Sequence, residues 1–204
     1  MSLDDQPATP VEVSEDGTPV GPLAVQYVPQ IMTNWCWAAC IEMVFRFNGR
    51  QINKCDVVTK ELPIRGRPDD PNIQLPCTTL QLASPTSDIT CGEDTPCQIY
   101  NFWFQGQELP CKLNGPPDLP VSDVIAIIKT QIGTRQQPIH TQDSFHARVV
   151  AGYILDSSQQ IDQVYILDPD PSKGLGWRNF TDFDWTTMTL FYDFGVPVED
   201  PCSR

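Results

Sequence analysis

The order of residue patterns along this 204-residue chain restricts its fold more than any other feature. A helical spacing of apolar residues comes early, over residues 35–47, whereas β-branched and apolar runs of strand length come late. These runs are Ala147–Leu155, Gln163–Leu167 and Thr187–Phe194, with a turn at Asp156–Ser158 between the first two. Helices followed by turn-linked strands predict an α+β fold with an antiparallel sheet.

Several shorter elements are expected around these patterns. Asn34 is placed to cap the helix Trp35–Phe47, and Asn48 and Gly49 are placed to end it. Ser122 is placed to cap a second helix over Asp123–Ile132 that ends at Gly133. A short strand at Val25–Pro29 and a short helix near Lys54–Glu61 complete the prediction.

The composition divides the chain into a lead-in and one domain. Residues 1–21 are polar, acidic and rich in turn-forming residues, so they are expected to be extended. Residues 22–204 are expected to form one domain that carries an irregular Cys-rich insertion at about 63–120. The aromatic run Tyr100–Phe104 inside the insertion is interpreted as a short buried strand, with a wall of a substrate groove as the alternative.

The charge and hydropathy of the chain exclude some partners. A formal net charge of −13 repels phosphate backbones, so nucleic acid is not an expected partner. No apolar run approaches the roughly 18 residues needed to cross a bilayer, so a membrane is not expected either. The sequence does not indicate an oligomeric state.

Eight cysteines are many for a reducing compartment. We therefore expect disulfides and a secreted or extracytoplasmic location, although the first residues show no signal peptide. No CxxC pair occurs, and His140 and His146 are six residues apart, so a zinc site is not expected. No cofactor is expected.

Four residues have the properties that cysteine catalysis requires. Cys36 lies in the first turn of the first predicted helix, where exposed N–H groups and the helix dipole favour a thiolate. His146 directly precedes an apolar strand and can take the thiol proton, while Asp168 ends the next strand and can orient the imidazole. Gln30 lies six residues before Cys36, where its amide can donate to an oxyanion.

Other residues are weaker candidates for the same roles. His140 is a rival of His146 but is not followed by a strand of the right kind. Asp162 and Asp170 are rivals of Asp168, which itself could be only a turn residue before a proline. Histidine inside a core and cysteine in a disulfide are the structural alternatives for His146 and Cys36.

The segment Gln30–Cys40 resembles the nucleophile motif of papain-like cysteine peptidases, which carry Gln six positions before the catalytic Cys and Trp immediately after it, as Trp37 is here. Phe145–Tyr153 is similar to the histidine strand of that family, and Val164–Pro169 to its Asp-Pro strand end. The match is closest to a bacterial branch that includes effector proteases of plant pathogens and the peptidases that remove double-glycine leaders. Papain itself has Asn where this chain has Asp168.

The resemblance implies a papain-like fold, with the first helix packed on a C-terminal antiparallel sheet. It implies that Cys36 is the nucleophile, His146 the general base and acid, Asp168 the orienting residue and Gln30 the oxyanion donor. It further implies hydrolysis of a peptide or isopeptide bond in a protein or peptide substrate, through a thioester. A transglutaminase-like or amidase acyl transferase and an inactive binding module are the alternatives.

The resemblance also bears on the neighbouring cysteine and tryptophans. Similar sequences imply a disulfide between Cys40 and Cys55, while a Cys36–Cys40 disulfide is a rival that would block the enzyme. Trp35 and Trp37 are expected to be structural, with Trp37 packed beneath the catalytic helix.

Overall fold

The computed structural model describes residues 19–55, 57–58, 112–114 and 119–192 of the chain. Its first helix is α1 (Cys36–Phe47), and a second helical segment consists of α4 (Val121–Ile128) followed by the π-helix η2 (Lys129–Thr134). Two short 3₁₀ helices, η3 (Phe180–Asp182) and η4 (Trp185–Thr187), lie near the end of the described chain. The predicted strand at Tyr100–Phe104 and the Cys-rich insertion lie outside the described residues.

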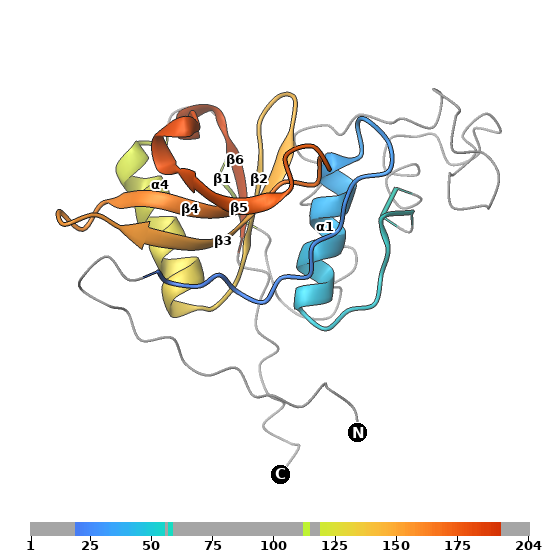
Figure 1. Ribbon diagram of the computed structural model, residues 1–204, viewed down its shortest axis with the longest axis horizontal. Coiled ribbons are helices and arrows are strands. Elements are labelled where there is room, and N and C mark those ends of the chain that lie inside the picture. The colour runs from blue at the N-terminus through green and yellow to red at the C-terminus, as the bar shows by residue number, and fades with distance from the viewer. Residues whose placement is uncertain (1–18, 56, 59–111, 115–118, 193–204) are drawn as a thin grey trace, which may run out of the picture.

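Within these residues, six strands form one antiparallel sheet in the order β1-β6-β2-β3-β4-β5 (Figure 1). The strands are β1 (Lys112–Asn114), β2 (Ile139–Gln142), β3 (Ala147–Leu155), β4 (Ile161–Leu167), β5 (Leu175–Asn179) and β6 (Thr189–Tyr192). The predicted antiparallel α+β architecture is confirmed. The strands expected near 147–155, 163–167 and 187–194 are present, whereas β1, β2 and β5 were not predicted.

The helix α1 begins one residue later than predicted. Its N-cap is Trp35, and no side-chain hydrogen bond caps it, so the prediction that Asn34 caps the helix is wrong. Burial stabilises this helix instead, because its residues from Cys36 to Phe45 are all buried. Glu42 is buried among them and forms ion pairs with Arg46 at 2.5 Å and with Lys54 at 3.7 Å.

The second helical segment also differs from its prediction at both ends. The α4 helix starts at Val121 with Pro120 as its N-cap, which places Ser122 in the first turn and not at the cap. Gly133 lies within η2 and does not end the helix. Val25–Pro29 forms no strand, although Val20 makes an isolated bridge with Tyr153.

The sheet is the middle layer of three, with α1 on one face and α4 with η2 on the other (Figure 1). Ala147, Val149 and Ala151 of β3 pack in the core beneath α1, while Val150 packs in the opposite core. A register shift after Val150 then reverses this alternation, so that Tyr153 also joins the opposite core. Residues at the start of β3 therefore lie close to α1.

The segment before α1 ties the helix to the sheet. Leu23 N donates to Ala151 O at 2.7 Å, and Gln30 N donates to Pro169 O at 2.8 Å. Gly21 permits this close approach, because it has a φ of +90° and a Cβ there would lie 2.7 Å from Ala151 O. These bonds place the start of α1 beside the end of β4. Across the described parts of the chain, we find no helix with the length and hydrophobicity to span a bilayer.

Candidate active site

His146 is held by the tight connection between β2 and β3. The strands pair as far as Gln142 and Ala147, so four residues make the turn. Asp143 Oδ1 accepts the backbone N–H groups of Phe145 at 2.8 Å and of His146 at 2.7 Å. These bonds fix the backbone of His146 immediately before β3, at the end of the sheet that faces the start of α1.

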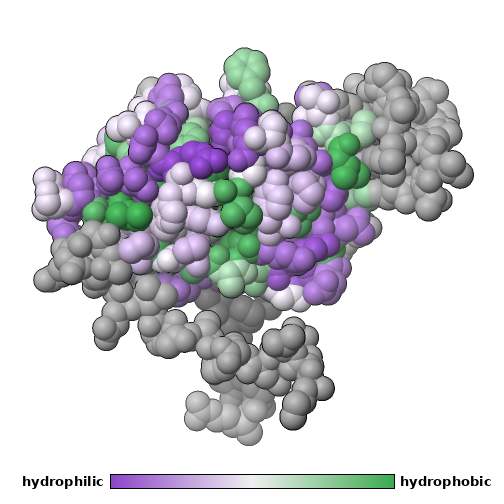
Figure 2. Space-filling model, viewed as in Figure 1, coloured by the Kyte–Doolittle hydropathy of each residue, from purple (hydrophilic) through white to green (hydrophobic). Residues whose placement is uncertain are grey.

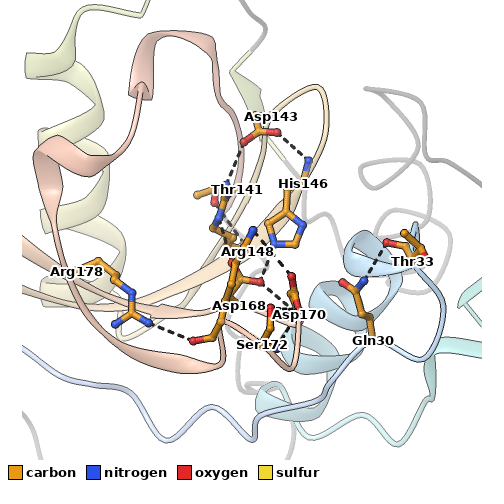
Figure 3. Close-up of polar contacts among 11 residues, drawn as sticks. Gln30, Thr33, Thr141, Asp143, His146, Arg148, Asp168, Asp170, Ser172 and Arg178 are labelled. Carbon is orange, nitrogen blue, oxygen red and sulfur yellow. Dashed lines mark hydrogen bonds and ion pairs between the residues drawn. The ribbon is translucent and has the colours of Figure 1, made fainter.

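Asp168 follows β4 and lies beside His146, because β3 and β4 are antiparallel and pair Val149 with Leu167. Its Oδ1 lies 2.6 Å from His146 Nε2 and also accepts the Asp170 backbone N–H at 3.0 Å. Figure 3 shows these contacts at the ends of the two strands. The Asp168 side chain is only 7% exposed, so its contact with the imidazole is largely shielded from water.

The thiol of Cys36 completes the group from the other side. Cys36 is the first residue of α1 and is buried, and it lines the same cavity as His146. Because Nε2 faces Asp168, Nδ1 is the imidazole nitrogen left for the sulfur. The unsatisfied N–H groups and positive dipole end of the helix favour negative charge at this position.

The surroundings of His146 favour its protonated form. Burial alone lowers its pKa, but the hydrogen bonds and charges of Asp168 and Cys36 outweigh burial and raise the pKa to about 9. An imidazolium between a carboxylate and a thiol is the arrangement that acid–base catalysis on a cysteine requires.

A cavity of about 50 Å³ opens beside the thiol. Its walls come from the start of α1 and from the β2–β3 turn, and they consist of Asn34, Cys36, Trp37, Gln142, Asp143, Ser144, Phe145 and His146. Phe145 is 93% exposed. Figure 2 shows a hydrophobic group that projects from the molecule over the β2–β3 turn. The Phe145 side chain is therefore an exposed aromatic group on the wall of the cavity that Cys36 also lines.

Gln30 lies on the α1 side of the site, but it is not among the residues that line the cavity. Its Nε2 donates to Thr33 O at 2.9 Å (Figure 3). An amide NH₂ has two donors, so one remains for an oxyanion. Asn34, which the sequence suggested only as a helix cap, lines the cavity directly. The oxyanion role of Gln30 stays a prediction.

Arg148 belongs to the site and was not singled out from the sequence. It lies two residues after His146 on β3, where its Nη1 is 3.1 Å from Asp143 Oδ2 and its Nε is 3.4 Å from Asp168 Oδ2. Its position on the histidine strand was visible in the sequence. Its two carboxylate partners become evident only when the turn and the β3–β4 pairing are known.

Cys40 is a buried free thiol one helical turn after Cys36. The predicted Cys40–Cys55 disulfide is therefore wrong, and the rival Cys36–Cys40 disulfide is not formed because Cys36 is also a free thiol. Burial, followed by the neighbouring charge of Cys36, raises the pKa of Cys40 well above its usual value. Cys40 therefore stays a neutral thiol and contributes packing.

The rival residues occupy other places. His140 is buried within β2, where its ring lies 4.9 Å from that of Phe191, and burial lowers its pKa to about 3. Asp170 accepts hydrogen bonds from Ser172, and Asp162 is exposed on β4. Among the described residues, no group of three or more His, Cys, Asp or Glu side chains could hold a metal ion.

Comparison with solved structures identifies the fold. UfSP from C. elegans matches with a TM-score of 0.51 and 11% identity, over 90% of this chain and 34% of that one. The chain has a papain-like fold. The peptidase domain of Streptococcus ComA, a bifunctional ABC transporter involved in quorum sensing, matches with a TM-score of 0.48 and 17% identity, over 82% of this chain and 96% of that one.

The chain thus spans about one third of the length of the UfSP structure that it matches. No protein-family model and no curated protein matches the sequence. At such identities the comparison establishes the papain-like fold alone, and the chemistry must be argued from the site.

Proposed function

We propose that this protein is a cysteine peptidase that hydrolyses peptide or isopeptide bonds. The observation that carries the proposal is the arrangement of three side chains from three elements. Cys36 and His146 line one cavity, Cys36 helps to raise the pKa of His146, and the Nε2 of His146 lies 2.6 Å from Asp168 Oδ1. A nucleophile, a base and an orienting carboxylate in this order suit acyl transfer.

In the proposed first step, Cys36 Sγ attacks the carbonyl carbon of the scissile bond as a thiolate. The tetrahedral oxyanion is stabilised by the Cys36 backbone N–H at the start of α1 and by the Gln30 amide. The C–N bond then breaks, and His146 gives its proton to the departing amine. The product of this half-reaction is a thioester on Cys36.

In the second step, a water molecule gives a proton to His146 and attacks the thioester carbonyl. The C–S bond breaks, the peptide leaves as a carboxylic acid that loses its proton to solvent, and the thiolate and imidazolium are restored. Asp168 keeps the imidazole in one orientation through both steps, since its Oδ1 contacts the nitrogen that faces away from the sulfur.

The test is cleavage of a peptide library by the wild type and by Cys36→Ala in parallel. We expect cleavage products with the wild type only, and we expect the variant to keep its fold. An amine added to the same reactions distinguishes hydrolysis from acyl transfer, because a transferase forms a new amide with it. Absence of products with the wild type, or equal products with both proteins, would contradict the proposal.

A further inference from the structure

The guanidinium of Arg148 joins two carboxylates that come from different parts of the chain. Nη1 contacts Asp143 in the β2–β3 turn at 3.1 Å, and Nε contacts Asp168 after β4 at 3.4 Å. The Arg148 side chain is 14% exposed, so water screens these contacts less than on an open surface. A planar guanidinium can bind two acceptors through different nitrogens, which a lysine ammonium cannot do with the same geometry.

Each of these carboxylates holds a different part of His146 through its other oxygen. Asp143 Oδ1 accepts the His146 backbone N–H at 2.7 Å, while Asp168 Oδ1 lies 2.6 Å from the ring nitrogen Nε2. One arginine therefore fixes the second oxygen of both anchors. Rotation of either carboxylate about its side-chain bonds would break a contact with Arg148 and a contact with His146 together.

The packing around Arg148 gives it a fixed place. The ring of Phe183 lies 5.6 Å from the centre of the guanidinium, within the range of a cation–π contact. The ring centroids of Phe183 and Trp185 are 5.4 Å apart, and those of the stacked rings of Trp185 and Phe180 are 4.8 Å apart. The Trp185 indole N–H donates to Phe180 O at 2.7 Å, which fixes this aromatic cluster.

We propose that Arg148 is a positioning residue, which holds the imidazole of His146 in its working orientation by fixing Asp143 and Asp168 at the same time. Arg148 is not among the residues that line the cavity beside Cys36. Its loss should therefore lower kcat and leave KM nearly unchanged. This kinetic part of the inference rests on the proposed peptidase function.

The kinetic experiment compares Arg148→Met with the wild type. We expect kcat to fall on the order of 10²-fold, because small displacements of a catalytic group have effects of that size. Arg148→Lys should recover part of the loss, since one ammonium can hold only one of the two carboxylates well. The matched control is Arg178→Met, because Arg178 is exposed and donates to the backbone carbonyls of Trp177 and Lys173. It should keep wild-type kcat.

A second experiment needs no substrate, so it remains informative if the peptidase proposal fails. The chain has two histidines, and His140 has a pKa of about 3, so an NMR titration at neutral and alkaline pH reports on His146. Among the described residues, the charged or ionisable groups around that ring are Cys36 on α1, Asp143 in the turn, Arg148 on β3, and Asp168 and Asp170 after β4.

The direction of the change in this titration decides between two roles of Arg148. If Arg148 positions Asp168, its removal weakens the Asp168–His146 contact and the pKa of His146 falls. If Arg148 acts on the ring only through its positive charge, its removal raises that pKa, and the proposal is wrong. An unchanged titration in a folded variant also overturns it. Arg148→Lys is titrated too, so the proposal can still be tested if Arg148→Met fails to fold.

Discussion

Nε2 of His146 and Oδ1 of Asp168 lie 2.6 Å apart, although the two residues are 22 positions apart in the sequence. The antiparallel pairing of β3 and β4 brings them together, because one residue precedes β3 and the other follows β4. The contact leaves the other ring nitrogen for Cys36, which lies at the start of α1 and lines the same cavity as His146. In the proposed mechanism, the sheet thus provides the base and its partner, and the helix provides the nucleophile.

Replacement of Asp168 by Asn should lower activity and change its pH dependence. An amide keeps the shape of the side chain but loses the negative charge that favours the imidazolium. We expect kcat to fall on the order of 10²-fold, and the alkaline limb of the rate profile to move below its wild-type position near pH 9. Wild-type and Asp168→Asn profiles of kcat and of kcat/KM against pH measure both effects, because the kcat/KM profile reports the pKa of the free enzyme. An unchanged alkaline limb of the kcat/KM profile would contradict this role of Asp168.

The stability of the protein should fall as the pH rises through about 9. The pKa of His146 is raised from 6.5 to about 9 in the folded state, so its protonated form is favoured by folding. This contribution is complete below pH 6.5 and is lost on passing pH 9. We expect a loss on the order of 2 kcal/mol, after allowance for partial solvent screening.

Urea unfolding at a series of pH values measures that loss. His146→Gln is the control, since it removes the titrating group and should remove the dependence assigned to it. If the free energy of unfolding of the wild type stays level between pH 6.5 and about 9, the imidazolium is not stabilised as described. An equally steep fall in His146→Gln would show the same.

Cys40 should contribute to stability and not to catalysis. Its side chain is buried and free, so Cys40→Ala should cost about 1 kcal/mol through a small cavity. Cys40→Ser should cost more, about 1–3 kcal/mol, if the buried hydroxyl lacks a good hydrogen-bond partner. Urea unfolding gives these free energies. Peptide mapping of the unreduced protein shows whether Cys40 is a free thiol. A Cys40–Cys55 disulfide in that map would refute the assignment.

Phe145 should affect substrate binding without affecting the fold. Its side chain is 93% exposed on the wall of the cavity, so Phe145→Ala should change the free energy of unfolding by less than about 0.5 kcal/mol. We expect KM for peptide substrates to rise several-fold, because an exposed aromatic ring at the cavity offers apolar contact. Leu175→Ala, at a residue 48% exposed on β5, is the matched control. Equal KM values for Phe145→Ala and Leu175→Ala would argue against a contact between the Phe145 ring and the substrate.

The sequence was sufficient to predict the elements with a strong periodic pattern. The β-branched, apolar run of β3 and the turn after it predicted that strand with its observed bounds, and the apolar spacing of α1 placed the helix to within one residue. The same patterns placed Cys36, His146 and Asp168 at element ends. Their meeting follows from the antiparallel order of the strands, which the helices-then-strands pattern had indicated.

The features that were missed depend on contacts between distant segments. β2 has only four residues and β5 is largely exposed, so neither has a clear apolar pattern. The cap at Asn34 failed because burial of α1 stabilises the helix without a side-chain cap. The role of Arg148 depends on a turn and a neighbouring strand, and no local pattern encodes such a contact.

The rate at which iodoacetamide alkylates Cys36 tests the central claim most directly. The label is located by mass spectrometry of peptides, with the wild type and His146→Ala compared at about pH 6, well below the pKa of an ordinary thiol. If His146 holds the sulfur as a thiolate, Cys36 is labelled in the wild type at least about tenfold faster than in the variant, and Cys40 stays unlabelled. Equal rates in the two proteins, or labelling of Cys40 in preference to Cys36, would contradict the account.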